Sequence, residues 1–167
     1  SMLNSIEPKE WSKFQYSIYV GYDQEDPILD KQRTKLIKEI DKILEQHKDD
    51  VLVKYHVLPP AKCITLLWNI LFIDATADGN DYFYQVNDDV SILTSGWTTK
   101  FVDKLRENDD FGVLGPNDQL WQCRLLTQSF VSRKHYEIFH WYFPTNIKDW
   151  YSDNWITQVY GPENTFC

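Results

Sequence analysis

The sequence predicts one α/β domain built around a mainly parallel sheet. Aromatic and β-branched runs alternate along the chain with segments whose apolar residues recur at helical spacing, an order typical of parallel strands covered by helices. The run from Tyr82 to Val86 is almost entirely apolar or aromatic, as expected for a strand buried on both faces. The chain has 167 residues, which suits a single domain, residues 1–167, with a sizeable core.

The first half of the chain is expected to form three strands and two helices. The strands are rich in aromatic and β-branched residues and end at turn formers such as Pro59-Pro60 and Asp78-Gly79-Asn80. The helices carry apolar residues three and four positions apart. In chain order, the expected elements are strand 14–20, helix 29–47, strand 51–58, helix 61–76 and strand 82–86.

The second half is expected to form shorter elements. Gly115-Pro116 stops a short apolar strand, and Ser152 is placed to cap the N-terminus of the last helix. In chain order, the expected elements are helix 97–107, strand 111–114, strand 125–131, helix 133–140 and helix 152–159. The resulting order of elements indicates an α/β sandwich, in which ligands bind at the carboxyl ends of the strands.

The charge of the chain argues against nucleic acid as a partner. The formal net charge is -8, and phosphate neutralisation needs clustered Lys and Arg. Basic residues gather only at 31–38 and around Arg133-Lys134. No run of 18 apolar residues and no signal peptide is seen, so no membrane segment is expected. The cytoplasm is the default location, and the lumen of the endoplasmic reticulum or Golgi applies if the chain is a fragment.

The cysteines predict free thiols. Cys63, Cys123 and Cys167 are odd in number and far apart, without the short spacing of a zinc site. Reduced side chains are therefore expected in place of a disulfide framework.

A pair of carboxylates carries the main functional signal. Asp-Asp occurs at 49–50, 88–89 and 109–110, but only Asp88-Asp89 directly follows a strand of the buried type. Two adjacent anions at the edge of a core repel each other, so backbone amides in an Asx-type turn, or a cation, must offset that repulsion. Both interpretations stay open. Mg²⁺ or Mn²⁺ is the natural cation for carboxylate oxygens and often takes its other ligands from water and a diphosphate.

A series of motifs then resembles glycosyltransferases of the GT-A fold, nucleotide-sugar-dependent enzymes similar to glycosyltransferase family 2. The resemblance covers the chain from about Tyr16 to Gly161. It implies a Rossmann-like three-layer α/β/α sandwich, and transfer of a sugar from a UDP- or GDP-sugar to a hydroxyl of a glycan, protein or small-molecule acceptor. The motifs are, in order, DGNDYFYQVNDDV, GW, FGVLGPND, LTQSFVSRKHYEIFHWYFP and WYSDNWITQVYG.

The resemblance also implies roles for single residues. The Asp-x-Asp motif of the family corresponds to Asn87-Asp88-Asp89, with Asn87 in the first Asp position, and Asp88 and Asp89 are the implied ligands of Mn²⁺ or Mg²⁺. Asp153 is the implied general base of an inverting reaction, and Asp149 is the reserve candidate. Ordinary structural roles stay open for these residues. Tyr22-Asp23 would then be a polar turn, Lys62 an exposed side chain, Trp97 a hydrophobic anchor and Asp153 an acid at the start of a helix. The implied donor-binding residues are Tyr22, Asp23, Lys62, Asn87, Asp88, Trp97, Gly115 and Asp118.

One part of the family pattern is missing. Members begin with a strand whose loop holds the nucleotide base, whereas residues 3–11 lead directly into the run 14–20. Three explanations stay open: a fragment of a longer enzyme, a permuted or inserted domain, or a catalytically inactive relative that serves as a binding or scaffold module. Another metal-dependent phosphate enzyme, such as a nucleotidyltransferase, is a further alternative, but with 6 Gly in the chain no glycine-rich phosphate loop is seen.

Overall fold

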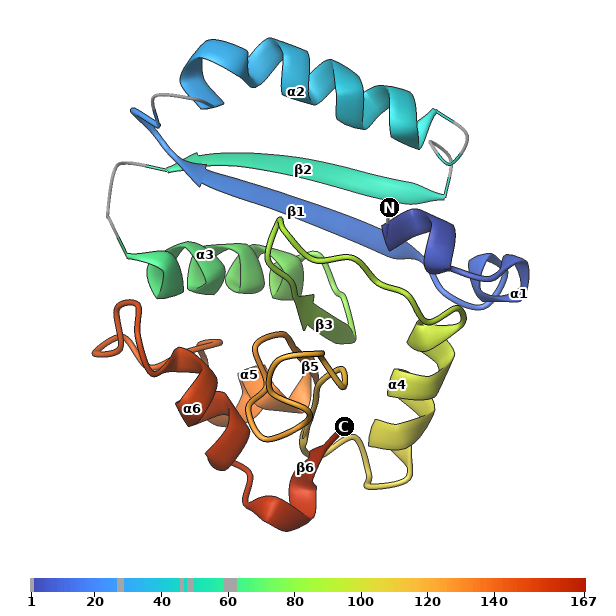
Figure 1. Cartoon of the computed structure of the whole chain (residues 1–167), viewed down its shortest axis with the longest axis vertical. Helices are drawn as coiled ribbons and strands as arrows, with labels where there is room; N and C mark the ends of the chain where they lie inside the picture. Colours follow the sequence, from blue (N-terminus) through green and yellow to red (C-terminus); the bar gives the residue numbers. More distant parts are fainter. Residues whose placement is uncertain (1, 27–28, 46, 48–49, 59–62) are drawn as a thin grey trace.

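A computed structural model describes residues 2–26, 29–45, 47, 50–58 and 63–167. Its described residues form helices around two separate small sheets, so the mixed α/β class is confirmed (Figure 1). In place of the single, mainly parallel sheet expected, one sheet is parallel and the other is mixed.

The parallel sheet consists of β1 (Tyr16–Asp23) and β2 (Val51–Leu58), paired along their whole length. Helices α2 (Leu29–Leu44) and α3 (Ile64–Ala77) lie on opposite sides of it (Figure 1). Apolar residues of β1 and β2 cluster with Ile40 and Leu44 of α2. On the other face, a Cβ added to Gly21 would lie 2.8 Å from Leu67 of α3, so the missing side chain lets α3 approach the sheet.

The mixed sheet has the strand order β3-β5-β4-β6. Its strands are β3 (Tyr82–Gln85), β4 (Val113–Leu114), β5 (Ser129–Ser132) and β6 (Thr165–Phe166). β5 is antiparallel to β3 and β4, and β6 is parallel to β4. The connection from β4 to β5 contains no helix among the described residues, which allows the chain to reverse direction between neighbouring strands.

The remaining elements complete the layers around this sheet. They are the 3-10 helices η1 (Met2–Ser5) and η2 (Pro162–Asn164) and the helices α1 (Pro8–Trp11), α4 (Trp97–Arg106), α5 (Lys134–Phe139) and α6 (Ser152–Gln158). Ser152 is not the N-cap that we expect from the sequence. Tyr151 occupies that position in a left-handed conformation, and the Ser152 hydroxyl donates to the carbonyl oxygen of Asp149.

The core explains the high aromatic content of the chain. Phe72 of α3 lies edge to face with Phe83 of β3 at 4.7 Å and with Tyr142 at 5.1 Å between ring centroids. Around them, α3, α5 and α6 close over one face of the mixed sheet. Val102 and Leu105 of α4 belong to a second buried cluster, which covers the opposite face of this sheet. Most large rings therefore stabilise the fold by burial and edge-to-face packing.

A buried carboxylate joins the N-terminal segment to α4. Glu10 is fully buried, and its Oε1 accepts hydrogen bonds from the backbone amide of Thr99 at 2.7 Å and from its hydroxyl at 2.8 Å. The other oxygen accepts the amide of Glu7 at 2.9 Å. Thr99 lies in the first turn of α4, so Glu10 places a negative charge where free amides and the helix dipole favour it.

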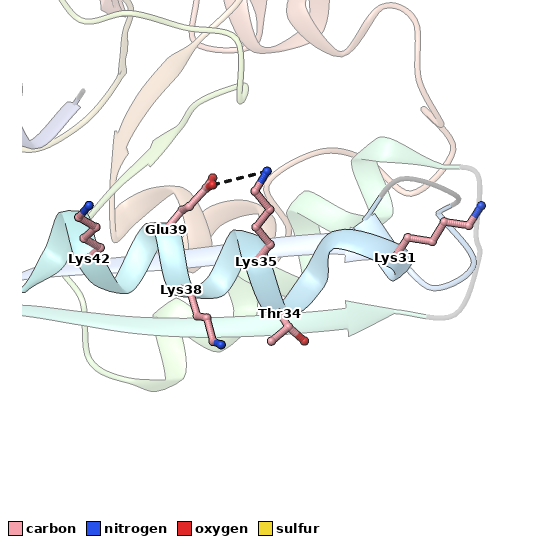
Figure 2. A pocket seen from close by; sticks show the side chains of 6 residues that line it. All are labelled: Lys31, Thr34, Lys35, Lys38, Glu39 and Lys42. Carbon is pink, nitrogen blue, oxygen red and sulfur yellow. Dashed lines mark ion pairs between the residues drawn. The ribbon is translucent and has the colours of Figure 1, made fainter.

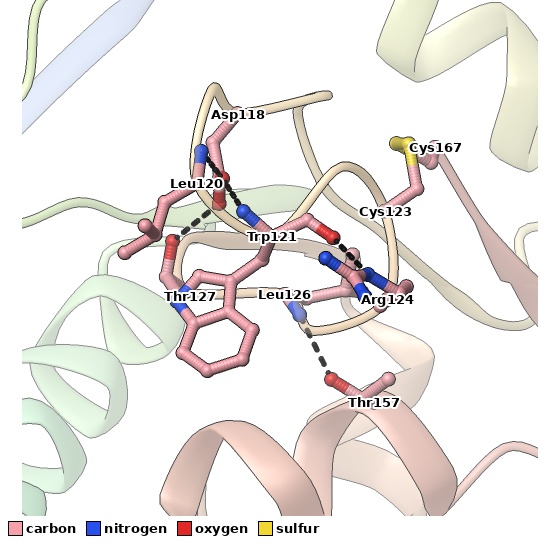
Figure 3. Close-up of a disulfide and its surroundings, with 9 residues drawn as sticks. All are labelled: Asp118, Leu120, Trp121, Cys123, Arg124, Leu126, Thr127, Thr157 and Cys167. Atoms are coloured by element: carbon pink, nitrogen blue, oxygen red, sulfur yellow. Dashed lines mark hydrogen bonds between the residues drawn. A yellow bond between two sulfur atoms is a disulfide. The ribbon is translucent and has the colours of Figure 1, made fainter.

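The expectation of reduced thiols is wrong for two of the three cysteines. Cys123 and Cys167 form a disulfide with their Cα atoms 5.7 Å apart (Figure 3), whereas Cys63 is free. The pairing of β6 with β4 brings the C-terminal strand beside the segment that leaves β4. Because 44 residues separate the two cysteines, their spacing gives no sign of this contact. None of the described helices is both long and apolar enough to cross a membrane.

Candidate functional site

Two predicted site segments emerge at the same edge of the mixed sheet. Since β3 and β4 are both antiparallel to β5, they run in the same direction and end at the same side. Asn87-Asp88-Asp89 follows β3, and Gly115 to Asp118 follows β4. We call these two segments the carboxyl edge. The sheet thus gathers polar residues from two strand ends, as expected for a ligand site in an α/β protein.

Asp88 and Asp89 form an exposed turn directly after β3. Within the described residues, neither carboxylate accepts a hydrogen bond or forms an ion pair. Asn87 is also exposed, and its Oδ1 accepts a hydrogen bond from Gln85 Nε2 at 3.1 Å. Water therefore solvates the two anions, and both remain open to a cation. No group of three or more His, Cys, Asp or Glu side chains arranged to hold a metal occurs in the described part of the chain.

Asp118 organises the loop that follows β4. One carboxylate oxygen accepts the amides of Leu120 at 2.8 Å and Trp121 at 2.5 Å, and the other accepts the Thr127 hydroxyl at 3.1 Å (Figure 3). Burial raises the pKa of Asp118, but these hydrogen bonds outweigh it and leave the pKa below its usual value. The carboxylate thus has a structural role in shaping the edge, whatever it binds.

Gly115 lets the same loop pack against the residues that lead into β5. A Cβ at this position would lie 2.5 Å from Leu126 Cδ2 and 2.9 Å from the carbonyl oxygen of Gln128. Any side chain would therefore push the two segments apart. Leu126 in turn donates its amide to Thr157 Oγ1 of α6 at 2.9 Å, which ties the loop to α6.

Asp153 carries a half-buried carboxyl group. It lies in the first turn of α6, and its carbonyl oxygen accepts the Thr157 hydroxyl at 2.6 Å. Burial raises the pKa of the Asp153 carboxyl, and a hydrogen bond from Ser152, 3.5 Å long, offsets only part of this effect. Through Thr157, the helix that carries Asp153 contacts the loop shaped by Asp118.

Asp149 has a structural partner. Its Oδ1 accepts the amide of Ile64, the first residue of α3, at 3.2 Å. The carbonyl oxygen of the preceding Lys148 accepts the amide of Thr65 at 3.2 Å. Asp149 therefore caps α3 from a distant part of the chain.

The other predicted donor-binding residues are scattered. Trp97 is 6% exposed, and its indole nitrogen donates to Ser5 Oγ at 3.0 Å, so its ring lies in the core and is closed to a sugar in this conformation. Tyr22 is buried and Asp23 half-buried at the end of β1, in the other sheet. The hydroxyl of Tyr22 has no hydrogen-bond partner among the described residues. Lys62 lies outside the described residues.

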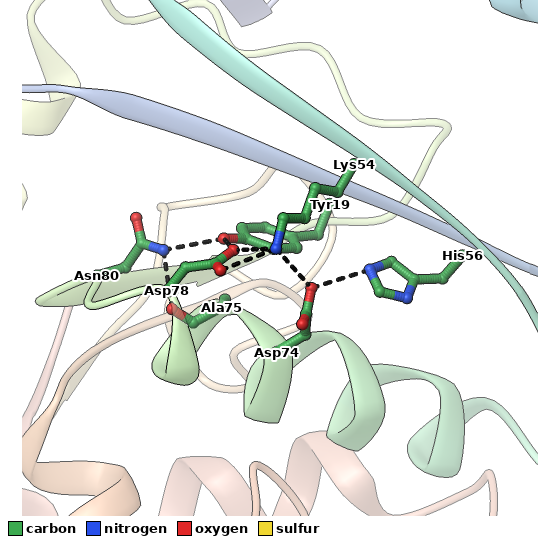
Figure 4. A network of polar contacts seen from close by, with 7 residues as sticks. All are labelled: Tyr19, Lys54, His56, Asp74, Ala75, Asp78 and Asn80. Carbon is green, nitrogen blue, oxygen red and sulfur yellow. Dashed lines mark hydrogen bonds and ion pairs between the residues drawn. The ribbon is translucent and has the colours of Figure 1, made fainter.

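A polar network on the parallel sheet escapes the sequence reasoning. Lys54 Nζ lies 2.6 Å from Asp78 Oδ2 and 3.4 Å from Asp74 Oδ2, and the Tyr19 hydroxyl donates to Asp78 at 2.5 Å (Figure 4). Hydrogen bonds from Lys54 and then Tyr19 lower the pKa of Asp78. His56 Nε2 is 3.1 Å from Asp74, although its direction is poor for a hydrogen bond. The network fastens the end of α3 to β1 and β2. The i, i+4 spacing of Asp74 and Asp78 is its one sequence signal.

Two shallow hollows of the described surface border α2. The first is lined mainly by lysines, and its one ion pair joins Lys35 to Glu39 at 3.9 Å (Figure 2). Its lining residues are Lys31, Thr34, Lys35, Lys38, Glu39 and Lys42. Neither hollow includes a predicted site residue, so we interpret this face as a solvated helix surface.

Comparison of the chain with protein-family models, with curated proteins and with solved structures gives no match. Its function must therefore be inferred from its own residues.

Proposed function

We propose that the chain is a metal-dependent glycosyltransferase domain, which moves a sugar from a nucleoside-diphosphate sugar to an acceptor hydroxyl. One observation carries the proposal: the candidate carboxylates have opposite environments. Asp88 and Asp89 are exposed at a strand end and have no partner among the described residues, whereas Asp153 is half-buried with a raised pKa. Sites that use one carboxyl group for binding and another for proton transfer typically place the two in different environments.

The donor set at the carboxyl edge fits Mn²⁺ or Mg²⁺. Mg²⁺ usually takes one or two protein carboxylates and completes its shell with water and phosphate oxygens. Asp88 and Asp89 supply two exposed carboxylates, while Asn87 is engaged by Gln85. When bound, such a cation would neutralise the negative charge that develops on the departing nucleoside diphosphate.

Asp153 is the residue proposed to accept the proton. A carboxylate with a raised pKa is a stronger base than an ordinary surface aspartate. In an inverting reaction, Asp153 would take the proton of the acceptor hydroxyl while that oxygen attacks the anomeric carbon. Ser152 and Thr157 hold the backbone and carboxyl of this residue in place.

The proposal includes the three-layer α/β/α fold of the GT-A type. α3 packs against both β1 and β3, so the two sheets share a helix layer. A strand hydrogen-bonded between β1 and β3 would join them into one sheet of the three-layer GT-A type. Such a strand would come from a further segment of chain or from a partner.

A turnover assay with Asp153→Asn tests the proposed base. Asn keeps the size of the side chain but does not accept a proton at neutral pH. We expect the variant to lose transfer from UDP- or GDP-sugars while it keeps metal-dependent nucleotide binding. Asp103→Asn, an exposed aspartate of α4, is the matched control and should transfer normally. Normal turnover by Asp153→Asn would eliminate Asp153 as the base.

The alternative function is a catalytically inactive binding or scaffold domain. The engagement of Asn87 by Gln85 favours it, because that oxygen is then less available to a metal. Nucleotide binding without turnover of any sugar donor, in the parent protein, would support this alternative.

A further inference from the structure

Two aromatic side chains stand out on the surface beside α6. Trp150 is 87% exposed and Tyr151 is 75% exposed, whereas most large rings of the chain are buried or half-buried. Fully burying rings of this size removes roughly 150–250 Å² each from water, so leaving two adjacent ones exposed forgoes a large stabilisation. The two rings precede Asp153 by three and two residues.

The turn that carries the rings is fixed on both sides. Before it, Asp149 accepts the amide of Ile64 at 3.2 Å. After it, the Ser152 hydroxyl donates to the carbonyl oxygen of Asp149 at 3.1 Å, and the amide of Trp155 donates to the carbonyl oxygen of Tyr151 at 2.9 Å. The exposure of the rings is therefore a feature of an anchored turn at the junction of α3 and α6.

The backbone of this turn is also strained. Tyr151 has a φ of 74°, in the left-handed region that bulky residues rarely adopt. Strained non-glycine residues concentrate at functional sites, where surrounding contacts hold them in place. Here the hydrogen bonds of Asp149 and Trp155 supply those contacts.

We propose that Trp150 and Tyr151 form the acceptor subsite and bind an uncharged pyranose ring. This inference rests on the proposed function, because a base at Asp153 requires the acceptor hydroxyl at hydrogen-bonding distance from its carboxylate. The C–H face of a pyranose is apolar and packs on aromatic faces, while its hydroxyls need polar groups at the rim. Asn154 and Asn146 are exposed on either side of the turn and offer such groups.

The charge of the region argues against an anionic sugar. The chain carries a net charge of -8, and Asp149 and Asp153 flank the rings, with Lys148 as the one nearby cation in the segment 146–154. An acceptor with carboxylate or sulfate groups would be repelled by this field. The subsite is therefore assigned to neutral pyranose residues of a glycan.

Calorimetric titration of neutral oligosaccharides into the whole chain, without donor or metal, tests the subsite apart from catalysis. The probes are β-linked glucose, xylose, mannose and N-acetylglucosamine oligomers. We expect at least one to bind the parent and its Kd to rise roughly tenfold or more in Trp150→Ala, the loss typical of one stacking contact. Tyr151→Asn, which tolerates the left-handed backbone, should weaken binding similarly. Trp141→Ala removes another exposed ring and should bind like the parent.

The outcomes separate this inference from the proposed function. Oligosaccharide binding that depends on Trp150, in a protein with no metal-dependent nucleotide binding, would retain the subsite and reject the transferase. Equal binding by the parent and both variants would overturn the subsite. So would failure of the folded parent to bind any of the four oligomers, in which case the two rings are assigned to contact with a protein.

Discussion

Acidification should destabilise this protein through His135. The imidazole is fully buried, and its Nε2 lies 3.0 Å from the carbonyl oxygen of Tyr142, which can only accept. Nε2 therefore carries the proton, and Nδ1 accepts the hydroxyl of Tyr160 at 2.6 Å. Burial lowers the pKa of His135 from 6.5 to about 4, because the charged form would lose its hydration.

The size of the effect follows from this difference in pKa. Below pH 6.5 the unfolded chain binds a proton that the native state takes up only near pH 4, so stability falls as the pH falls through this window. A difference of about 2.5 pKa units corresponds to about 3 kcal/mol in total, of which roughly 2 kcal/mol is lost between pH 7 and pH 5.

Urea unfolding at pH 7 and pH 5 measures this loss. His135→Gln keeps one donor and one acceptor at the site but does not titrate. We expect the parent to lose roughly 2 kcal/mol more than the variant on acidification. His140→Gln, a change at an exposed histidine, should behave like the parent. Equal losses in the parent and His135→Gln would show that His135 does not stay neutral in the fold.

Three further predictions concern other buried or linked groups. Glu10→Ala removes the carboxylate that caps α4 and should lower the free energy of unfolding by about 1–3 kcal/mol, whereas Glu107→Ala, at an exposed residue, should change it little. Cys123→Ser opens a loop of 44 residues and should lower stability by about 4 kcal/mol on chain-entropy grounds; a value like that of Cys63→Ser would contradict this. Asp153→Asn should have a free energy of unfolding at pH 7 equal to or above that of the parent. The raised pKa means that ionisation of Asp153 destabilises the native state as the pH rises, and Asn does not ionise. A clear loss of stability in this variant would refute burial as the origin of the raised pKa.

Local elements of the fold follow from the sequence with good accuracy. β2 spans the predicted residues 51–58, and β3 differs from its prediction by one residue at its end. These segments carry their own signals, namely β-branched and aromatic runs between turn formers. Element ends are less accurate: the strand expected at 125–131 spans Ser129–Ser132, and the helix expected at 29–47 ends at Leu44.

Long-range features do not follow from the sequence. The cap on α3 joins Asp149 to Ile64, 85 residues away, and the indole of Trp97 reaches Ser5 across 92 residues. Asp149 and Trp97 are residue types common in ligand sites, yet tertiary contacts give both of them structural partners. A common position for Asp88 and Asp118 at one sheet edge could be predicted, because residues at the carboxyl ends of parallel strands meet there. The antiparallel pairing of β3 with β5 could not be predicted.

The most direct test of the central claim is calorimetric titration of UDP and GDP into the protein, with and without Mn²⁺. We expect one nucleotide to bind the parent only when Mn²⁺ is present, and binding to be lost in Asp89→Asn. Asp109→Asn changes an exposed aspartate of another Asp-Asp pair, which has no place at the carboxyl edge, and should bind like the parent. Failure of the folded parent to bind either nucleotide with Mn²⁺, or equal binding by Asp89→Asn, would contradict a donor site at the end of β3.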